Sequence, residues 1–220
     1  RLTTTVGDAE RSKAEWRDLV SNDGFGFADR GLWQSEIRGI IDRMALFLAA
    51  EDGPSGVMDV VFEKGESSLF HEAVGHPFEG WAVAEGLSVF AGRLGQQVAS
   101  PKVTLVDSGN VPGLYGSAGM DDTGQPTRRN VLIQNGILTG YLLDRVAARK
   151  LGTQPTGSGR RQNYTYPSSD RMNNTYIEPG EDDDDEMIAS LARGLFVKSI
   201  GGGATNPVTG ALNVEVTEGY

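Results

Sequence analysis

Residues 131–138, with the sequence VLIQNGIL, place an Asn-Gly pair between two apolar runs. Such a pair is typical of the two-residue type I′ turn, because both central residues adopt positive φ and the turn matches the twist of its flanking strands. The stretch therefore predicts a tight antiparallel hairpin. It also indicates that this half of the chain is built largely from antiparallel strands.

Further strand patterns lie on both sides of this hairpin. Residues 56–62 are rich in valine, and residues 103–107 and 212–216 alternate between apolar and polar side chains. A short helix is predicted over residues 144–151, with Gly152 as its stop. Residues 157–161, GSGRR, are expected to form a flexible basic loop. The 30 glycines suit a fold with many turns rather than a helical bundle.

The first part of the chain has helical patterns instead. A helix is expected over residues 8–20, and a stronger one over 33–50, where isoleucine, methionine and leucine recur at helical spacing before Asp52-Gly53-Pro54. The predicted fold class is thus α+β: N-terminal amphipathic helices, followed by a curved, mostly antiparallel sheet around a metal-bearing helix. Residues 1–55 are expected to end an N-terminal domain, and 56–220 to form a β-rich domain.

Composition excludes several classes of protein. A formal net charge of −10 and a pI of about 4.7 argue against a nucleic-acid binder, which needs a basic face. No apolar run approaches the length of a membrane-spanning helix, and residues 1–5 lack the apolar core of a signal peptide. The absence of cysteine excludes a disulfide framework and is compatible with the cytoplasm, which is the expected location. Without an initiator Met, the chain is expected to be the middle of a longer one.

Both histidines of the chain lie in one stretch, HEAVGH, at residues 71–76. Two imidazoles beside a carboxylate can hold a divalent metal and activate its water. The common zinc-protease pattern spaces its histidines four residues apart, whereas His71 and His76 are five apart. On a regular helix, five residues rotate by roughly 140°, so the rings would diverge. One extra residue in the turn, a π-bulge, would return them to a common face. Pro77 favours such an irregularity because it lacks the N–H for the carbonyl of Ala73.

Five separate motifs resemble the TldD/PmbA family of metallopeptidases. They are HEAVGHPFEG, GRLGQQVASPKVTLVD, RRNVLIQNGILTGYLLDR, PTGSGRRQNY and DRMNNTYIEPG, and they occur in the family's order. The resemblance is dense from residue 58 to 220. Within the family, TldD-like members keep the HExxxH motif and PmbA-like partners lose it; this chain keeps it.

The resemblance implies one zinc ion per chain, held by His71 and His76, with Glu72 as the general base. It implies cleavage of small or unfolded peptides inside an enclosed cavity. The family usually takes its third ligand from a cysteine near the C-terminus, and this chain has none. The third ligand is therefore not identified, the domain is expected to be incomplete at its C-terminus, and the 220 residues alone are expected to be a poor enzyme.

Other residues have two interpretations each. Glu79 lies three residues after His76, and it is a candidate third ligand or, preferably, a partner that orients a histidine; it could also be an ordinary surface acid. Candidate peptide-binding residues are Arg160, Arg161, Tyr164, Asn173 and Tyr176. Ordinary solvated, turn and strand roles are equally compatible with them. The acidic run at residues 181–186 is interpreted as a solvated turn entering a helix, with a calcium site as the alternative.

Zinc-dependent peptide hydrolysis is therefore the predicted function. The alternative is a non-catalytic peptide-binding or partner subunit, as in family members that lack the motif. An enclosed cavity needs walls, and the predicted terminal strand has an unpaired edge, so a dimer is expected, either with itself or with a motif-lacking relative.

Overall fold

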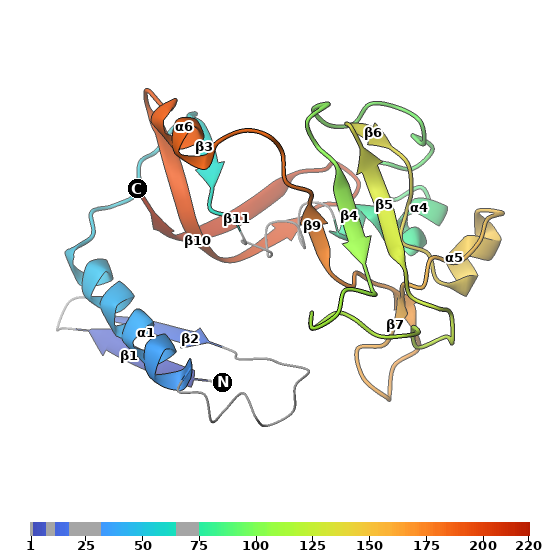
Figure 1. Cartoon of the computed structure of the whole chain (residues 1–220), viewed down its shortest axis with the longest axis horizontal. Coiled ribbons are helices and arrows are strands. Elements are labelled where there is room, and N and C mark those ends of the chain that lie inside the picture. Colours follow the sequence, from blue (N-terminus) through green and yellow to red (C-terminus); the bar gives the residue numbers. More distant parts are fainter. Residues whose placement is uncertain (1, 8–11, 18–31, 65–74) are drawn as a thin grey trace. The chain divides into compact units, whose positions relative to one another are not determined.

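The computed structural model describes residues 2–7, 12–17, 32–64 and 75–220. Its contacts divide the chain into two units (Figure 1). One comprises Arg1–Gly56 with Gly113–Tyr115, and the other comprises Val57–Pro112 with Gly116–Tyr220.

The first unit contains a hairpin and a long helix. Strands β1 (Leu2–Gly7) and β2 (Ser12–Arg17) pair antiparallel, and α1 (Leu32–Ala49) packs on them, with Ile40 and Met44 buried. The helix predicted over residues 33–50 is confirmed. The helix predicted over residues 8–20 is wrong at residues 12–17, where Ala14 and Trp16 recur at the period of a strand. The remainder of that prediction lies outside the described residues.

A four-stranded antiparallel sheet forms the centre of the second unit. Its strand order is β6 (Ile137–Leu138), β5 (Arg129–Gln134), β4 (Leu105–Ser108) and β9 (Thr175–Ile177). Asn135 and Gly136 connect β5 to β6 with φ of 48° and 82°. The predicted type I′ hairpin is thus confirmed, because that turn requires positive φ at both central residues.

Short helices complete the core beside this sheet. α3 (His76–Phe78) and α4 (Gly80–Ala84) follow the histidine motif, and α5 (Arg145–Lys150) packs against α4. Side chains of these helices share one hydrophobic cluster with β4, β5 and β6. Asp144 accepts hydrogen bonds from Val146 N and Ala147 N, both 2.8 Å, and so caps α5. Gly152 has φ of 66°, which confirms its role as the helix stop.

A three-stranded sheet has the order β11 (Leu212–Gly219), β10 (Gly194–Thr205) and β3 (Asp59–Phe62). β10 and β11 are antiparallel, with register shifts between Val197 and Gly202, whereas β3 and β10 are parallel. The strands predicted near residues 56–62 and 212–216 are confirmed. The chain is therefore a mixed α+β structure with mainly antiparallel sheets, as expected, while residues 71–74 of the predicted metal-bearing helix lie outside the described part.

Two surface segments have a definite structure. The loop predicted over residues 157–161 is wrong in part, because β7 (Gly159–Arg160) pairs with β8 (Ser169–Asp170) and the Asp121 carboxylate accepts a hydrogen bond from Gly159 N at 2.8 Å. The acidic run enters α6 (Asp184–Ala189), capped by Asp183, and its side chains are exposed, as predicted.

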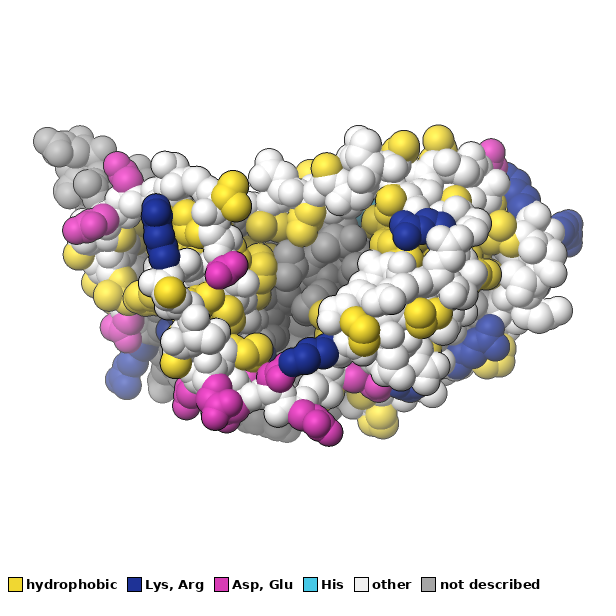
Figure 2. All heavy atoms as spheres, turned by 90° about the horizontal axis from the view of Figure 1, so that it is seen from above, with side chains coloured by type: hydrophobic (Ala, Val, Ile, Leu, Met, Phe, Trp, Pro, Cys, Tyr) yellow, Lys and Arg dark blue, Asp and Glu magenta, His cyan; other side chains and the backbone are white. Residues whose placement is uncertain are grey.

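Figure 2 shows acidic and basic side chains together on one face of the molecule. Within the described ranges, no helix has the length and apolarity needed to cross a membrane.

Candidate metal centre and its supporting residues

The described part of the histidine motif is a helical turn that ends directly after its proline. Gly75 has helical angles, φ −64° and ψ −63°, and α3 runs only from His76 to Phe78. Glu79 is extended, with φ −65° and ψ 127°, and α4 begins at Gly80. His71 and Glu72 fall in residues 65–74, outside the described residues, as does most of the turn in which the π-bulge is predicted; the one described residue before His76, Gly75, is π-helical. Among the residues that are described, no group of three or more potential ligands is arranged to hold a metal ion.

Glu79 is fully buried, with 0% of the residue exposed, and its carboxylate is surrounded by donors. His76 Nδ1 lies 3.2 Å from Oε2, and Trp81 Nε1 donates to the same oxygen at 3.0 Å. Arg171 Nη1 donates to Oε1 at 2.9 Å and to Oε2 at 2.8 Å. The Glu79 carboxylate thus holds Nδ1 of the His76 ring.

The charge state of Glu79 follows from two opposing effects. Burial raises the pKa of its carboxyl, but hydrogen bonds from His76, Trp81 and Arg171, together with the positive charge of Arg171, lower it. The net pKa lies below the ordinary value for glutamate, so the side chain is ionised at neutral pH. An ionised carboxylate accepts a hydrogen bond from the histidine, as second partners of metal-binding histidines commonly do.

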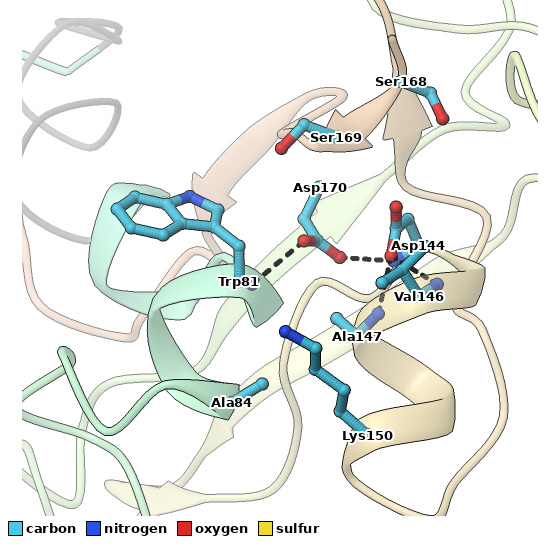
Figure 3. Close-up of a pocket in the computed structure, with 9 residues that line it drawn as sticks. All are labelled: Trp81, Ala84, Asp144, Val146, Ala147, Lys150, Ser168, Ser169 and Asp170. Atoms are coloured by element: carbon cyan, nitrogen blue, oxygen red, sulfur yellow. Dashed lines mark hydrogen bonds between the residues drawn. The ribbon is translucent and has the colours of Figure 1, made fainter.

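The segment Asp170–Met172 packs against this turn from a distant part of the chain. Asp170 Oδ2 accepts a hydrogen bond from Trp81 N at 2.9 Å, and its Oδ1 accepts one from Asp144 N. Figure 3 shows this carboxylate between α4 and the start of α5. Met172 lies against Gly75 so closely that a Cβ there would fall 1.9 Å from its Sδ. The turn that carries His76 is therefore held by three consecutive residues.

A small pocket of about 190 Å³ opens beside this contact. Trp81, Ala84, Lys150, Ser169 and Asp170 are among its lining residues (Figure 3). Burial raises the pKa of Asp170 to about 6, and the neighbouring Asp144 charge also raises it, although hydrogen bonds from backbone N–H groups oppose this. Asp170 is thus a buried acid with mainly backbone partners.

Two of the predicted peptide-binding residues meet at another buried acid. Asn173 donates to Asp107 from its backbone N at 2.8 Å and from Nδ2 at 3.0 Å. Burial raises the pKa of Asp107, while donors from Asn173 and Thr175 and the charge of Arg160 counteract the shift. Arg160 also donates to Met172 O at 3.0 Å. Arg160 and Asn173 therefore support the segment that holds Glu79.

The other candidates lie elsewhere. Tyr176 is half-buried in β9 opposite Val106, Arg161 is exposed, and Tyr164 is 91% exposed. Peptide binding by any of the five stays a prediction.

Comparison with known proteins decides the family. A profile of the PmbA/TldA metallopeptidase C-terminal domain matches residues 55–220. This chain belongs to the TldD/PmbA family. It is 41% identical over 232 residues to a metalloprotease TldD homolog of Haemophilus influenzae, covering 100% of this chain and 47% of that protein. It is 37% identical over 100 residues to a zinc metalloprotease TldD homolog of Saccharolobus solfataricus, covering 46% of this chain and 22% of that protein.

A solved family structure has the same fold. The crystal structure of TldE from Thermococcus kodakarensis aligns with a TM-score of 0.62 and 29% identity, covering 74% of this chain and 39% of the TldE chain. The chain thus spans about half the length, or less, of the relatives it matches. The Haemophilus relative, which matches over the whole of this chain, is named a metalloprotease.

Sequence reasoning missed Arg171, Asp170 and Trp81 at the candidate site. Asp170 and Arg171 open the motif DRMNNTYIEPG, and Trp81 directly follows the motif HEAVGHPFEG. The only available signal was an Asp-Arg pair in an otherwise neutral strand-like segment. That signal does not reveal which residue the pair contacts.

Proposed function

We propose that this chain supplies the metal-binding turn of a zinc-dependent peptidase that hydrolyses small or unfolded peptides. The observation that supports the proposal best is the fully buried Glu79 carboxylate on His76 Nδ1. A histidine held in this way has a defined tautomer and ring direction, which is what a metal ligand needs and a solvated histidine does not. The residues present therefore fit a metal at this turn.

The chain's own residues have separate roles in this proposal. His71 and His76 hold the ion, and Glu72 accepts the proton of the attacking water and passes it to the leaving amine. Zinc, when bound, lowers the pKa of its water and polarises the scissile carbonyl. Glu79 orients His76 instead of binding the metal, because both of its oxygens already accept hydrogen bonds. The third ligand is not identified. The name of the Saccharolobus relative supports zinc as the metal.

The second candidate function is a non-catalytic peptide-binding or partner subunit. The similarity to the TldE structure favours this role, because it shows that a protein named differently from TldD has the same fold. An HExxxH motif favours the catalytic role instead. We further propose that the full-length protein forms a dimer with itself or a motif-lacking relative, and that it works in the cytoplasm. Light scattering and cell fractionation test these two points.

The domain assignment also belongs to this proposal. Residues 1–55 would belong to an N-terminal domain, and residues 56–220 would belong to a metallopeptidase domain. Slow peptide hydrolysis by the 220-residue chain alone stays a prediction.

The decisive experiment combines metal analysis with peptide hydrolysis on the full-length protein. Wild type is expected to carry one zinc per chain and to cleave an unstructured peptide. Glu72→Gln should retain the zinc and lose cleavage, because it removes the base and leaves the ligands. His76→Ala should lose both. Cleavage by Glu72→Gln at the wild-type rate would eliminate the catalytic assignment, and a zinc-free wild type would eliminate the metal site.

A further inference from the structure

The partner that fixes Glu79 most firmly comes from far along the chain. Arg171 lies 92 residues from Glu79, yet its Nη1 donates to both carboxylate oxygens at 2.9 Å and 2.8 Å. Charge-assisted hydrogen bonds of this kind are roughly twice as strong as neutral ones. The Trp81 indole N–H also donates to this carboxylate, but it carries no charge. Arg171 is thus the main source of positive charge for a carboxylate that has no contact with water.

The backbone of Arg171 is itself held on both sides. Arg171 N donates to Ser158 O at 2.8 Å, and Asp170 pairs with Gly159 in the β7–β8 ribbon. The Asp170 carboxylate accepts from Trp81 N, and Met172 packs on Gly75. These contacts leave little freedom for the guanidinium to approach Glu79 in another way. The segment therefore presents Arg171 to Glu79 in a fixed geometry.

We propose that Arg171 is a positioning residue for the metal-binding His76, acting through Glu79. This inference rests on the proposed function. The guanidinium locks the carboxylate in the orientation in which Oε2 accepts from His76 Nδ1. With its hydrogen on Nδ1, the neutral ring carries its lone pair on Nε2, the nitrogen that the proposed function assigns to the metal. Without Arg171, a buried carboxylate short of donors turns toward other partners, and the ring loses its direction.

A second arginine–glutamate pair provides a matched comparison. Arg129 Nη2 bonds to Glu178, and the two side chains are 44% and 38% exposed. Arg171 is equally accessible at 49%, but its partner Glu79 is at 0%. Exposed pairs contribute little, whereas removing one member of a pair with a buried charge leaves that charge uncompensated. Arg129→Met therefore controls for loss of an arginine of similar exposure away from His76.

The experiment measures zinc affinity of the full-length protein by competition with a chelator at constant pH. Removing the direct partner of a metal-binding histidine, here Glu79, usually costs roughly 10- to 100-fold, so Arg171→Met, which acts through Glu79, is expected to weaken zinc binding by about 10-fold, the lower end of that range. Arg129→Met should bind as wild type. Arg171→Lys should restore most of the affinity, because a single nitrogen already reaches both oxygens. Melting temperatures of the metal-free proteins separate a loss of folding from a loss of positioning.

Each result supports or overturns the assignment. If folded Arg171→Met binds zinc as tightly as Arg129→Met, Arg171 has no positioning role. If Arg171→Met does not fold, Arg171→Gln provides the test, because its neutral amide removes the positive charge beside Glu79 and keeps a polar side chain. Its zinc affinity is expected to fall by about threefold or more, and an affinity equal to that of Arg129→Met overturns the inference. A wild type that binds no zinc contradicts the proposed function itself.

Discussion

Gly80 lies between Glu79, which contacts His76, and Trp81, which lines the pocket. Its replacement by alanine should destabilise the folded chain. Its N–H donates to Leu142 O at 2.8 Å, so helix α4 starts in contact with the chain leading into α5. A Cβ on Gly80 would lie 2.6 Å from Leu143 Cδ2, 2.7 Å from Ala147 Cβ and 2.9 Å from Leu142 O. The Leu143 methyl can rotate away, but Ala147 has no other rotamer and Leu142 O is backbone. The clash therefore requires α4 and α5 to separate.

Two effects set the magnitude. In a helix, glycine to alanine normally stabilises by about 0.5–1 kcal/mol, because the unfolded chain loses freedom. Overpacking of a dense core costs about 1–3 kcal/mol. Because two of the three contacts cannot relax locally, the upper part of this range applies, about 2–3 kcal/mol. After subtraction of a helix gain of about 1 kcal/mol, Gly80→Ala should lower the free energy of unfolding by about 1–2 kcal/mol. With a urea slope of about 2 kcal/mol/M, the midpoint should fall by about 0.5–1 M.

Urea unfolding followed by tryptophan fluorescence and circular dichroism measures this change. Gly119→Ala is the matched control, because a Cβ at Gly119 meets nothing within 4 Å and its φ is not positive. Gly119→Ala should leave the midpoint unchanged or raise it slightly. The packing argument fails if Gly80→Ala is as stable as wild type, or if both variants lose the same free energy.

Three further predictions concern two buried side chains and one helix cap. Phe78→Ala should cost about 3–5 kcal/mol of unfolding free energy in a urea titration, because Phe78 is fully buried with its ring centroid 4.5 Å from that of Phe90; a cost under about 1 kcal/mol would contradict its place in the core. Asp170, whose folded pKa of about 6 lies above its usual 3.8, should stabilise the fold as pH falls from 6 towards 4, since the folded chain then binds the proton more tightly. Its carboxyl ¹³C shift should titrate near pH 6, and a midpoint near 4 would refute the burial argument. Asp183→Ala should cost about 0.5–2 kcal/mol in helix or protein stability, because Asp183 Oδ1 accepts from Asp185 N and Glu186 N; its helicity loss by circular dichroism should exceed that of Asp182→Ala, which leaves the cap in place.

Local patterns predicted much of the fold because they express local physics. The Asn135-Gly136 turn requires positive φ, and the Asp144 cap and Gly152 stop bound α5. The first hairpin escaped prediction because residues 12–17 are short, and Ala14 and Trp16 fit a helical face as well as a strand. Propensity alone does not decide such a segment, since pairing with β1 does.

At the candidate site too, some features could be predicted from the sequence and others could not. The HExxxH motif and the proximity of Glu79 to His76 follow from spacing along one turn. The contact of Arg171 with Glu79 does not, because no periodicity links residues in different elements 92 positions apart. Arg160 and Asn173 show the converse: they occur in family-like motifs, yet their described partners are Met172 and Asp107.

The 92-residue separation between Glu79 and Arg171 also affects when the contact can form during synthesis. On the ribosome, the HEAVGH segment emerges long before the arginine that completes its surroundings. During that interval, which lasts about 5–20 s at ordinary synthesis rates, Glu79 has no guanidinium to pair with and His76 has no fixed orientation. A metal site of the proposed kind therefore cannot reach its working geometry until the chain up to Arg171 has been made and folded back. Under the proposed function, the order of the motifs delays hydrolysis until most of the domain exists.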